Sequence, residues 1–439
     1  MQLESRPEWF EYILTNMKDA VLLTAKNGDL LNANPAARDL LGLELHGGVK
    51  IWDAIPFVEE NDALIQLFID GVMQKRSVNS TVRYVNPDGQ HFHLHVTLTS
   101  GQDDDGMILV VIHDLTSLTK VHSAFARYTS PEIADYVLST PEGAKQGGSS
   151  REVSILMSDL RGFTAMSTHL SSTELIDLIN HYFEFMSEAI SRNKGTVIEF
   201  LGDGIFSVFG APIDLPDHPA AAVRCAVEMQ NAMEKVNAWN REKGYPELEM
   251  GIGIHTGLAV VGNIGSEHKM KYGCMGETVN LAGRLESLST GGQIYISEKT
   301  LKMIPEGVTV AGENSFMPKG GRDELKVFEI TGIGKDLHLN SLSNKIEWEE
   351  LPSRGVYPFH LLNGKVVGEE TYHGQFFRMS ADGKYAWMKT DRHLFRLDNL
   401  MIRIAEADVY AKVTAVEADG YTIRFTSKPD HLKELMEKA

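Results

Sequence analysis

The chain has 439 residues, of which 43% are hydrophobic and 23% charged, so it is long enough for two or three domains with real cores. Its net charge of −18 makes the chain a poor candidate for sequence-independent nucleic-acid binding, which needs a basic surface, and two cysteines exclude a disulfide scaffold or cysteine-rich zinc site. The sequence has no apolar run of the ~20 residues needed to span a bilayer and no signal-peptide pattern, so we expect a cytoplasmic protein without a membrane span.

Residues 8–118 predict an α+β domain. An amphipathic helix is followed by short strands, a helix and two long strand-like runs, with the turn "NPDG" between the last strands of a hairpin. We expect a small antiparallel sheet with helices on one face. The strings "GDLLNANPAARDLLG" and "VVIHDLTSLTK" resemble a PAS domain, which implies a sensor whose signal stays unknown.

The string "HFHLHV" places His91, His93 and His95 on one face of a strand, because strand side chains alternate. A metal or haem site is one interpretation. The interpretation we favour is the solvated face of a half-buried strand.

Residues 119–150 predict a helical coupling segment and a linker. Leu118, Val121, Phe125 and Tyr128 form a short apolar stripe, which packs on a domain or pairs two parallel helices in a dimer. Ser130 predicts the N-cap of a second helix, and "PEGAKQGGSS" predicts a flexible linker.

Residues 151–331 predict a β-α-β-β-α-β order, the ferredoxin-like split βαβ plan. The strand 152–160 precedes a helix with a capping box from Ser171 to Glu174. A hairpin follows around "LGDG", then a helix over 218–244, and then a second hairpin of strands 248–257 and 258–265.

Two carboxylates lie at the ends or turns of these elements. Asp159 ends the first strand and Asp203 lies at the tip of the first hairpin, and neighbouring strands bring them together. Paired carboxylates suit two Mg²⁺ or Mn²⁺ ions, which prefer oxygen ligands. The backbone amides at Phe163 and Thr164, in "RGFT", are candidates for receiving phosphate oxygens.

The string "KYGCMGETVNLAGRLES" places Asn280 and Arg284 on one face of a helix. An amide and a guanidinium facing the same way can orient a ribose and neutralise charge on phosphorus. Together with "SDLRGFT", "FLGDGIFSVFGAP", "GIGIHTG" and "PKGGRDELKVFEI", these residues resemble the class III nucleotidyl cyclases over 151–331.

The resemblance implies conversion of a nucleoside triphosphate to its 3′,5′-cyclic monophosphate and pyrophosphate. Asp159 and Asp203 match the ligands of two divalent metal ions. Asn280 and Arg284 match the ribose-orienting and transition-state residues, and Lys319 matches the triphosphate-binding lysine. The family builds each site from two catalytic domains, so the resemblance also implies a head-to-tail homodimer.

Glu199 and Gly273 match the two base-reading positions of the family. A carboxylate accepts hydrogen bonds from the N1–H and N2 amine of guanine, which favours GTP. Gly273 has no side chain, so a backbone N–H, a water or Cys274 is left to face the guanine oxygen. The alternatives are an adenylate or dual-specificity cyclase, and a non-catalytic cyclase-like scaffold.

Residues 340–439 predict a small, mostly β domain closed by a charged helix. "FRMSADGKYAWM" and "VTAVEADGYTIRF" resemble a degenerate PilZ domain, a barrel that can bind cyclic di-GMP. Ser380 and Gly383 fit its turn motif, but the acid that begins the motif is missing and Arg354 stands without a second close arginine. A structural or docking role is therefore the prediction for this domain.

Overall fold

The structure is a computed structural model that describes residues 7–43, 48–74, 77–101, 106–305, 307–316, 324–340, 346–363, 366–429 and 431–438. It divides into two compact units, Met1–Tyr128 and Thr129–Ala439, which are described separately. Within these described ranges, no helix is long and apolar enough to cross a membrane.

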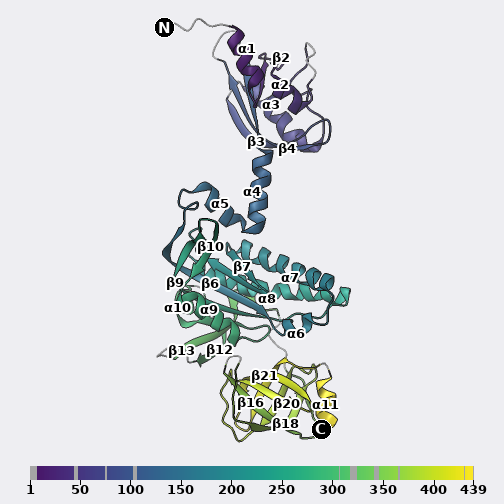
Figure 1. Cartoon of the computed structure of the whole chain (residues 1–439), viewed down its shortest axis with the longest axis vertical. Coiled ribbons are helices and arrows are strands. Elements are labelled where there is room, and N and C mark those ends of the chain that lie inside the picture. Colours follow the sequence, from purple (N-terminus) through teal and green to yellow (C-terminus); the bar gives the residue numbers. More distant parts are fainter. Residues whose placement is uncertain are drawn as a thin grey trace. The chain divides into compact units, whose positions relative to one another are not determined.

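The N-terminal unit is built on an antiparallel five-stranded sheet with the order β2-β1-β5-β4-β3 (Figure 1). Its core joins one sheet face to α2 and α3, as the expectation of helices on one face requires. The elements are α1 (Pro7–Asn16), β1 (Ala20–Thr24), β2 (Leu30–Ala33), α2 (Pro35–Leu41), a 3₁₀ turn (Glu59–Asn61), α3 (Asp62–Gln74), β3 (Val78–Val85), β4 (His91–Ser100), β5 (Ile108–Asp114) and α4 (Thr116–Tyr128).

The three histidines of β4 lie on the sheet face opposite the buried Leu94 and Val96. His95 stacks on His113 of β5, and Nδ1 of His113 lies 2.8 Å from the Asp19 carboxylate. Within the described part of the chain, no group of three or more His, Cys, Asp or Glu side chains is arranged to hold a metal ion. The histidines therefore lie on the face of β4 that is turned away from the core, and their solvated role stays a prediction.

The central part of the second unit is a nine-stranded sheet with the path β12-β13-β11-β9-β6-β8-β7, and off this path β10 pairs with β9 and β14 with β13 (Figure 1). Along the chain, β6, α7, β7, β8, α8 and β9 follow the expected order, while the ferredoxin-like classification stays a prediction. The elements are α5 (Pro131–Ser139), β6 (Gly147–Leu160), α6 (Phe163–Ser167), α7 (Ser172–Arg192), β7 (Thr196–Leu201), β8 (Gly204–Phe209), α8 (His218–Lys243), β9 (Met250–Ser266), β10 (Lys269–Met275), α9 (Glu277–Leu288), β11 (Ile294–Ser297), α10 (Glu298–Lys302), β12 (Val308–Phe316), β13 (Leu325–Ile333) and β14 (Leu337–His338).

Two helical layers cover this sheet. Residues of α7 and α8 pack with one face of β6, β8 and β9 in the largest core cluster, and α5 and α9 contribute to the cluster on the other face. The N-terminus of α7 has the expected capping box, since Ser171 and Glu174 exchange side chain and backbone hydrogen bonds. This sandwich fixes the ends of β6 and α9, on which the candidate site depends.

Two expectations for this region are wrong. The predicted hairpin of 248–257 and 258–265 is one continuous strand, β9, whose hairpin partner is β10. Residues 147–150 of the predicted linker belong to β6 and pair with β9 at 260–263. Both errors have one cause: backbone hydrogen bonds to β9 and β6 hold glycine-rich segments extended, which local composition does not reveal.

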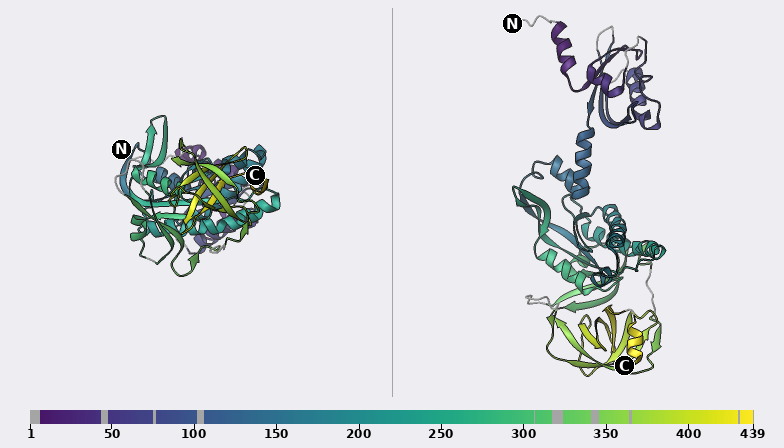
Figure 2. Two further views of the ribbon diagram at one scale, coloured as in Figure 1. Left: turned by 90° about the horizontal axis from the view of Figure 1, so that it is seen from below. Right: turned by 45° about the vertical axis from the view of Figure 1, so that its right-hand side comes forward.

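The C-terminal part of the second unit is a closed barrel, because the strand path β18-β19-β22-β21-β20-β16 returns to β18. Figure 2 shows this barrel in green to yellow, with α11 beside it. Leu432 and Met436 of α11 are buried in the barrel's core. The elements are β15 (Trp348–Glu350), β16 (Val356–Asn363), β17 (Val366–Val367), β18 (Tyr372–Ser380), β19 (Tyr385–Lys389), β20 (Asn399–Ile404), β21 (Ala407–Val416), β22 (Tyr421–Ser427) and α11 (Leu432–Lys438).

Candidate active site

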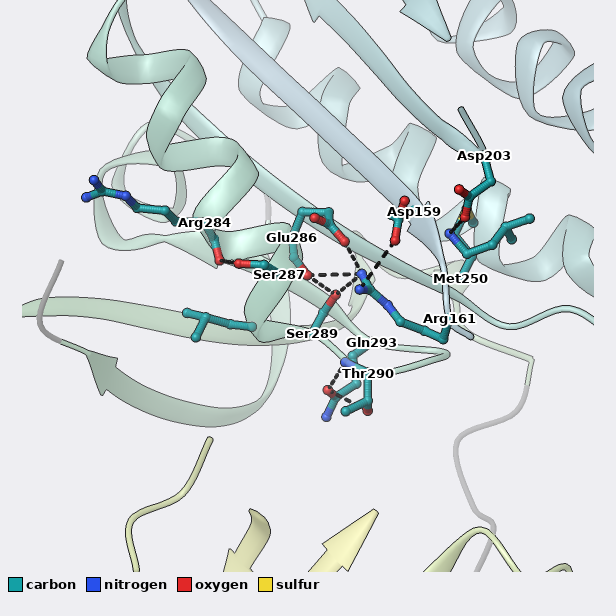
Figure 3. Close-up of polar contacts among 12 residues, drawn as sticks. Asp159, Arg161, Asp203, Met250, Arg284, Glu286, Ser287, Ser289, Thr290 and Gln293 are labelled. Atoms are coloured by element: carbon teal, nitrogen blue, oxygen red, sulfur yellow. Dashed lines mark hydrogen bonds and ion pairs between the residues drawn. The ribbon is translucent and has the colours of Figure 1, made fainter. Parts of the chain in front are cut away.

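Asp159 and Asp203 lie together at one end of the sheet (Figure 3). Asp159 is the penultimate residue of β6, and its neighbour Ser158 pairs with Ile205 of β8, so the tip that carries Asp203 reaches the end of β6. The Oδ2 atom of Asp203 accepts a hydrogen bond of 3.2 Å from the backbone N–H of Leu160. A Cβ added at Gly204 would lie 3.3 Å from the Asp159 carboxylate, so glycine permits this close approach.

The ionised forms of Asp159 and Asp203 are both disfavoured at this position. Burial, the negative charge of Asp203 and that of Glu286 raise the pKa of Asp159 to about 6. Burial also raises the pKa of Asp203, against the hydrogen bonds it accepts. A pair of acids in this setting is relieved by a bound cation, so the donor set fits divalent metal ions. Two carboxylates leave several coordination positions, which phosphate oxygens of a nucleotide can fill.

Arg161 is a residue of the site that sequence reasoning missed. Its guanidinium lies 3.7 Å from the carboxylate of Asp159 and forms a short ion pair with Glu286, and it also donates to the Glu286 carbonyl and to Ser289 (Figure 3). The Arg161 side chain is only 18% exposed. A Cβ added at Gly251 would lie 2.3 Å from this guanidinium, so the glycine leaves the space that Arg161 fills.

The glycines of "GIGIHTG" explain where α9 lies. Gly251, Gly253 and Gly257 share one face of β9, and a Cβ added at Gly253 would lie 2.0 Å from the backbone of α9. A Cβ added at Gly257 would lie 2.7 Å from Thr278 near the start of the same helix. The glycine face of β9 therefore receives α9 at backbone distance.

Asn280 and Arg284 lie on the exposed face of α9, one turn apart, as the spacing predicts. In Figure 3, Arg284 extends away from Asp159 and Asp203, while Glu286 of the same helix turns towards Arg161. One chain therefore brings the two carboxylates together but does not bring Arg284 to them. The ribose-orienting role of Asn280 and the transition-state role of Arg284 stay predictions.

Glu199 lies on β7, and its carboxylate forms a short ion pair with Lys271 of β10. Lys271 was missed, although it precedes Gly273 by two residues on one strand and so shares its face. A Cβ added at Gly273 would lie 3.2 Å from the end of the Ile264 side chain, so this position has little spare room.

Cys274 faces the other way. Its side chain belongs to the buried cluster with Tyr272, and burial raises the pKa of its thiol to about 12. The interpretation that Cys274 faces the base is therefore not supported by the structure.

The predicted phosphate-binding amides lie at the start of α6, which follows Gly162 in a left-handed conformation. Phe163 is half-buried and Thr164 exposed. Lys319 lies outside the described residues, so its role stays a prediction.

Comparison with protein-family models gives two matches. Residues 146–332 match the adenylate and guanylate cyclase catalytic domain, and residues 18–117 match a PAS domain. The resemblance of the tail to PilZ stays a prediction, and the closed β-barrel of the tail is a structural observation.

Among the individual relatives, some are named adenylate cyclase and others guanylyl cyclase. The chain is 30% identical over 211 residues to "Adenylate cyclase 1" of Rhizobium meliloti, covering 48% of this chain and 32% of that one. It is 25% identical over 272 residues to "Adenylate cyclase" of Anabaena cylindrica, covering 57% and 52%. The crystal structure of the guanylyl cyclase Cya2 matches with 46% identity and a TM-score of 0.43, over 44% of this chain and all of that one. The chain thus spans about a third to a half of these curated relatives.

Proposed function

We propose that this chain, which contains a class III nucleotidyl cyclase catalytic domain and an N-terminal PAS domain, is a sensor-regulated guanylate cyclase. The observation that carries the cyclase proposal is the meeting of Asp159 and Asp203 at one end of the sheet, with Asn280 and Arg284 on the exposed face of α9. The reaction converts GTP to 3′,5′-cyclic GMP and pyrophosphate.

Each of these residues has a chemical task. Asp159 and Asp203 would hold two divalent metal ions, which supply charge neutralisation and activation of the 3′-hydroxyl when bound. Asn280 would orient the ribose, and Arg284 would stabilise the charge that develops at the α-phosphorus. The amides at Phe163 and Thr164, together with Lys319, would bind the triphosphate.

The site requires a second copy of the chain. Arg284 and the carboxylates diverge within one chain, so a head-to-tail homodimer would place the metal ligands of one protomer against α9 of the other. Such a dimer has two equal sites. The PAS domain would bias the pairing of protomers, and the apolar stripe on α4 offers exposed Leu118 and Val121 for it.

Glu199 supports GTP as the substrate. Facing adenine, its carboxylate would oppose the N1 acceptor, and leaving acceptors unpaired costs about 1–3 kcal/mol. Adenylate cyclase is the second candidate, because both curated relatives quoted above carry that name and Gly273 offers no side chain to guanine.

The experiment is product analysis with purified full-length protein, GTP or ATP, and Mg²⁺ or Mn²⁺. We expect cyclic GMP to form faster than cyclic AMP at equal substrate. Equal rates would overturn the GTP assignment and leave the cyclase. No cyclic product with any combination would favour the non-catalytic scaffold.

A further inference from the structure

The C-terminal barrel contacts the catalytic domain through buried cations. Nζ of Lys412, on β21, donates to the carbonyls of Ser287 and Leu288, both at 2.8 Å. These are carbonyls of the last turn of α9, where a helix leaves its acceptors unpaired and carries partial negative charge. An ammonium group there satisfies both, and Lys412 is only 4% exposed.

Arg424, on β22, extends the same contact. Its guanidinium donates to Thr290 Oγ1 at 3.0 Å and to the Gly291 carbonyl at 2.6 Å, in the loop that follows α9. It also donates to the carboxylate of Glu249, which accepts a second hydrogen bond of 2.6 Å from Lys384. Burial alone would raise the pKa of Glu249, but Arg424 and Lys384 outweigh it and hold that pKa below its usual range.

Both cations need the acceptors that the catalytic domain supplies in this buried contact. Lys412 and Arg424 are directly opposite on neighbouring strands, and both are buried. Opposed like charges destabilise a sheet, and a buried charge needs a partner. Burial and the charge of Arg161 lower the pKa of Lys412 to about 7, against the attraction of Glu286. The end of α9 and Glu249 supply the acceptors.

The barrel contacts two segments of the catalytic domain, the end of α9 and Glu249, and Arg161 binds both of them. Its guanidinium binds Glu286 in the last turn of α9, and its backbone N–H donates to the Glu249 carbonyl at 2.7 Å. Its other side faces Asp159. A continuous chain of polar contacts therefore runs from barrel residue Lys412 through the end of α9 and Arg161 to the metal-ligand candidate.

We propose that the barrel is a positioning module of the cyclase: Lys412 and Arg424 hold the C-terminal end of α9, and Arg161 links that end to Asp159. This rests on the proposed function. Because α9 carries Arg284 for one site of the dimer and Asp159 serves the other, the Arg161–Glu286 pair also couples the two sites. Lys412, Arg424 and Arg161 are thus positioning residues that need not touch the nucleotide.

The test uses the full-length chain with Lys412→Met, which keeps length and removes charge, and Lys412→Arg, which restores it. The matched control is Lys433→Met, because Lys433 is a more exposed barrel lysine whose ion-pair partner, Glu349, is in the barrel. Hydrogen exchange of α9 amides is measured without nucleotide. In Lys412→Met, the last turn of α9 should exchange at least about fivefold faster, whereas the control matches wild type.

Kinetics give the second readout. In Lys412→Met, kcat should fall at least about fivefold while KM for GTP changes less than about twofold, because displacing α9 misplaces a transition-state group. Lys412→Arg should recover most of the loss. If Lys412→Met does not fold, Arg424→Gln takes its place with the same expectations.

Unchanged exchange in α9 would overturn the proposal, as would faster exchange with wild-type kcat. A wild-type protein that forms no cyclic nucleotide would contradict the proposed function instead. The exchange measurement would still decide whether the barrel holds α9.

Discussion

The carboxylate of Asp159 lies half-buried between a second acid and an arginine, and each neighbour alters its chemistry. Asp203 and Glu286 oppose its ionisation while Arg161 favours it, and the net effect is a raised pKa. Sites that need a metal commonly show this pattern, because charges that repel in the free protein become ligands when the cation binds. In the proposed metal-ligand role, catalysis and stability therefore make opposite demands on this residue.

Asp159→Asn should abolish activity without destabilising the protein. The amide keeps the shape but loses the charge, so we expect cyclisation to fall by at least about a thousandfold. The melting temperature without metal at pH 7.5 should stay the same or rise, because the repulsion with Asp203 disappears. Turnover assays and calorimetry check this. Activity within about tenfold of wild type would contradict the metal-ligand role.

Metal binding should depend on pH through the same group. Because the folded pKa of Asp159 is about 6, against an ordinary 3.8, protons compete with the cation below pH 6. The stability that Asp159 contributes through this shift is present below 3.8 and is lost as the pH rises through about 6.

We therefore expect the apparent Mn²⁺ affinity without nucleotide to rise about tenfold per pH unit up to about pH 6 and then to level off. Titration calorimetry from pH 5 to 8 measures it. A constant affinity between pH 5 and 6.5 would exclude Asp159 as the titrating ligand.

Glu199→Lys tests the base-reading residue. An ammonium would face the N1–H and N2 amine of guanine, leaving donors opposite donors, so kcat/KM for GTP should fall at least about thirtyfold, or ~2 kcal/mol. The ratio of ATP to GTP turnover should rise. Glu152→Lys is the matched control, since Glu152 is a similarly exposed acid paired with Lys299. An unchanged GTP rate would mean that Glu199 does not contact the base.

Among the elements, the β7–β8 hairpin decides whether the carboxylates meet. Its tip reaches the end of β6 only because Gly204 has no side chain. An added Cβ would lie 2.9 Å from the Ser158 carbonyl. A backbone atom cannot move aside as a flexible side chain can. Glycine at position 204 therefore serves the contact of the hairpin with β6, in addition to the pairing of β7 with β8.

Gly204→Ala should therefore weaken both fold and catalysis. We expect about 1–3 kcal/mol of lost stability from the overpacked contact. Activity should fall at least about tenfold as the Asp203 tip moves away from Asp159. Gly307→Ala is the control, because an added Cβ there meets nothing within 4 Å. Chemical denaturation and turnover assays measure the two effects, and a Gly204→Ala enzyme with wild-type activity would contradict this account.

At the scale of the whole molecule, the proposed dimer divides the catalytic groups of one chain between two sites. Arg284 points away from the carboxylates, so each proposed site would take its carboxylates from one protomer and α9 from the other. In that dimer the Arg161–Glu286 pair would connect the two sites through each protomer. Two mutations that inactivate different halves should compensate each other.

Mixing inactive Asp203→Ala and Arg284→Ala chains should restore activity. At equal amounts, half of the dimers are mixed and each has one intact site, so we expect about a quarter of the wild-type rate. Subunit exchange is confirmed with differently tagged chains. Two Asp203→Ala preparations mixed together serve as the control and should stay inactive. No recovery after confirmed exchange would contradict the shared site.

Features that depend on a local pattern of residues could be predicted from the sequence. The strand ending at Asp159, the hairpin carrying Asp203, the capping box at Ser171 and the helix face with Asn280 and Arg284 all follow from periodicity, caps and turns. The cyclase catalytic domain and the PAS domain could also be recognised from motifs, and comparison with family models supports both.

Contacts between segments that are distant in sequence could not be predicted and come from the folded chain. Arg161 meets Glu286 across 125 residues and Lys412 meets Ser287 across 125. No local signal encodes such pairs, because their energies depend on burial and on which acceptors the fold leaves unpaired. The continuous strand β9 has the same explanation, because hydrogen bonds to β6 and the close packing of α9 hold it extended where the sequence predicts a hairpin.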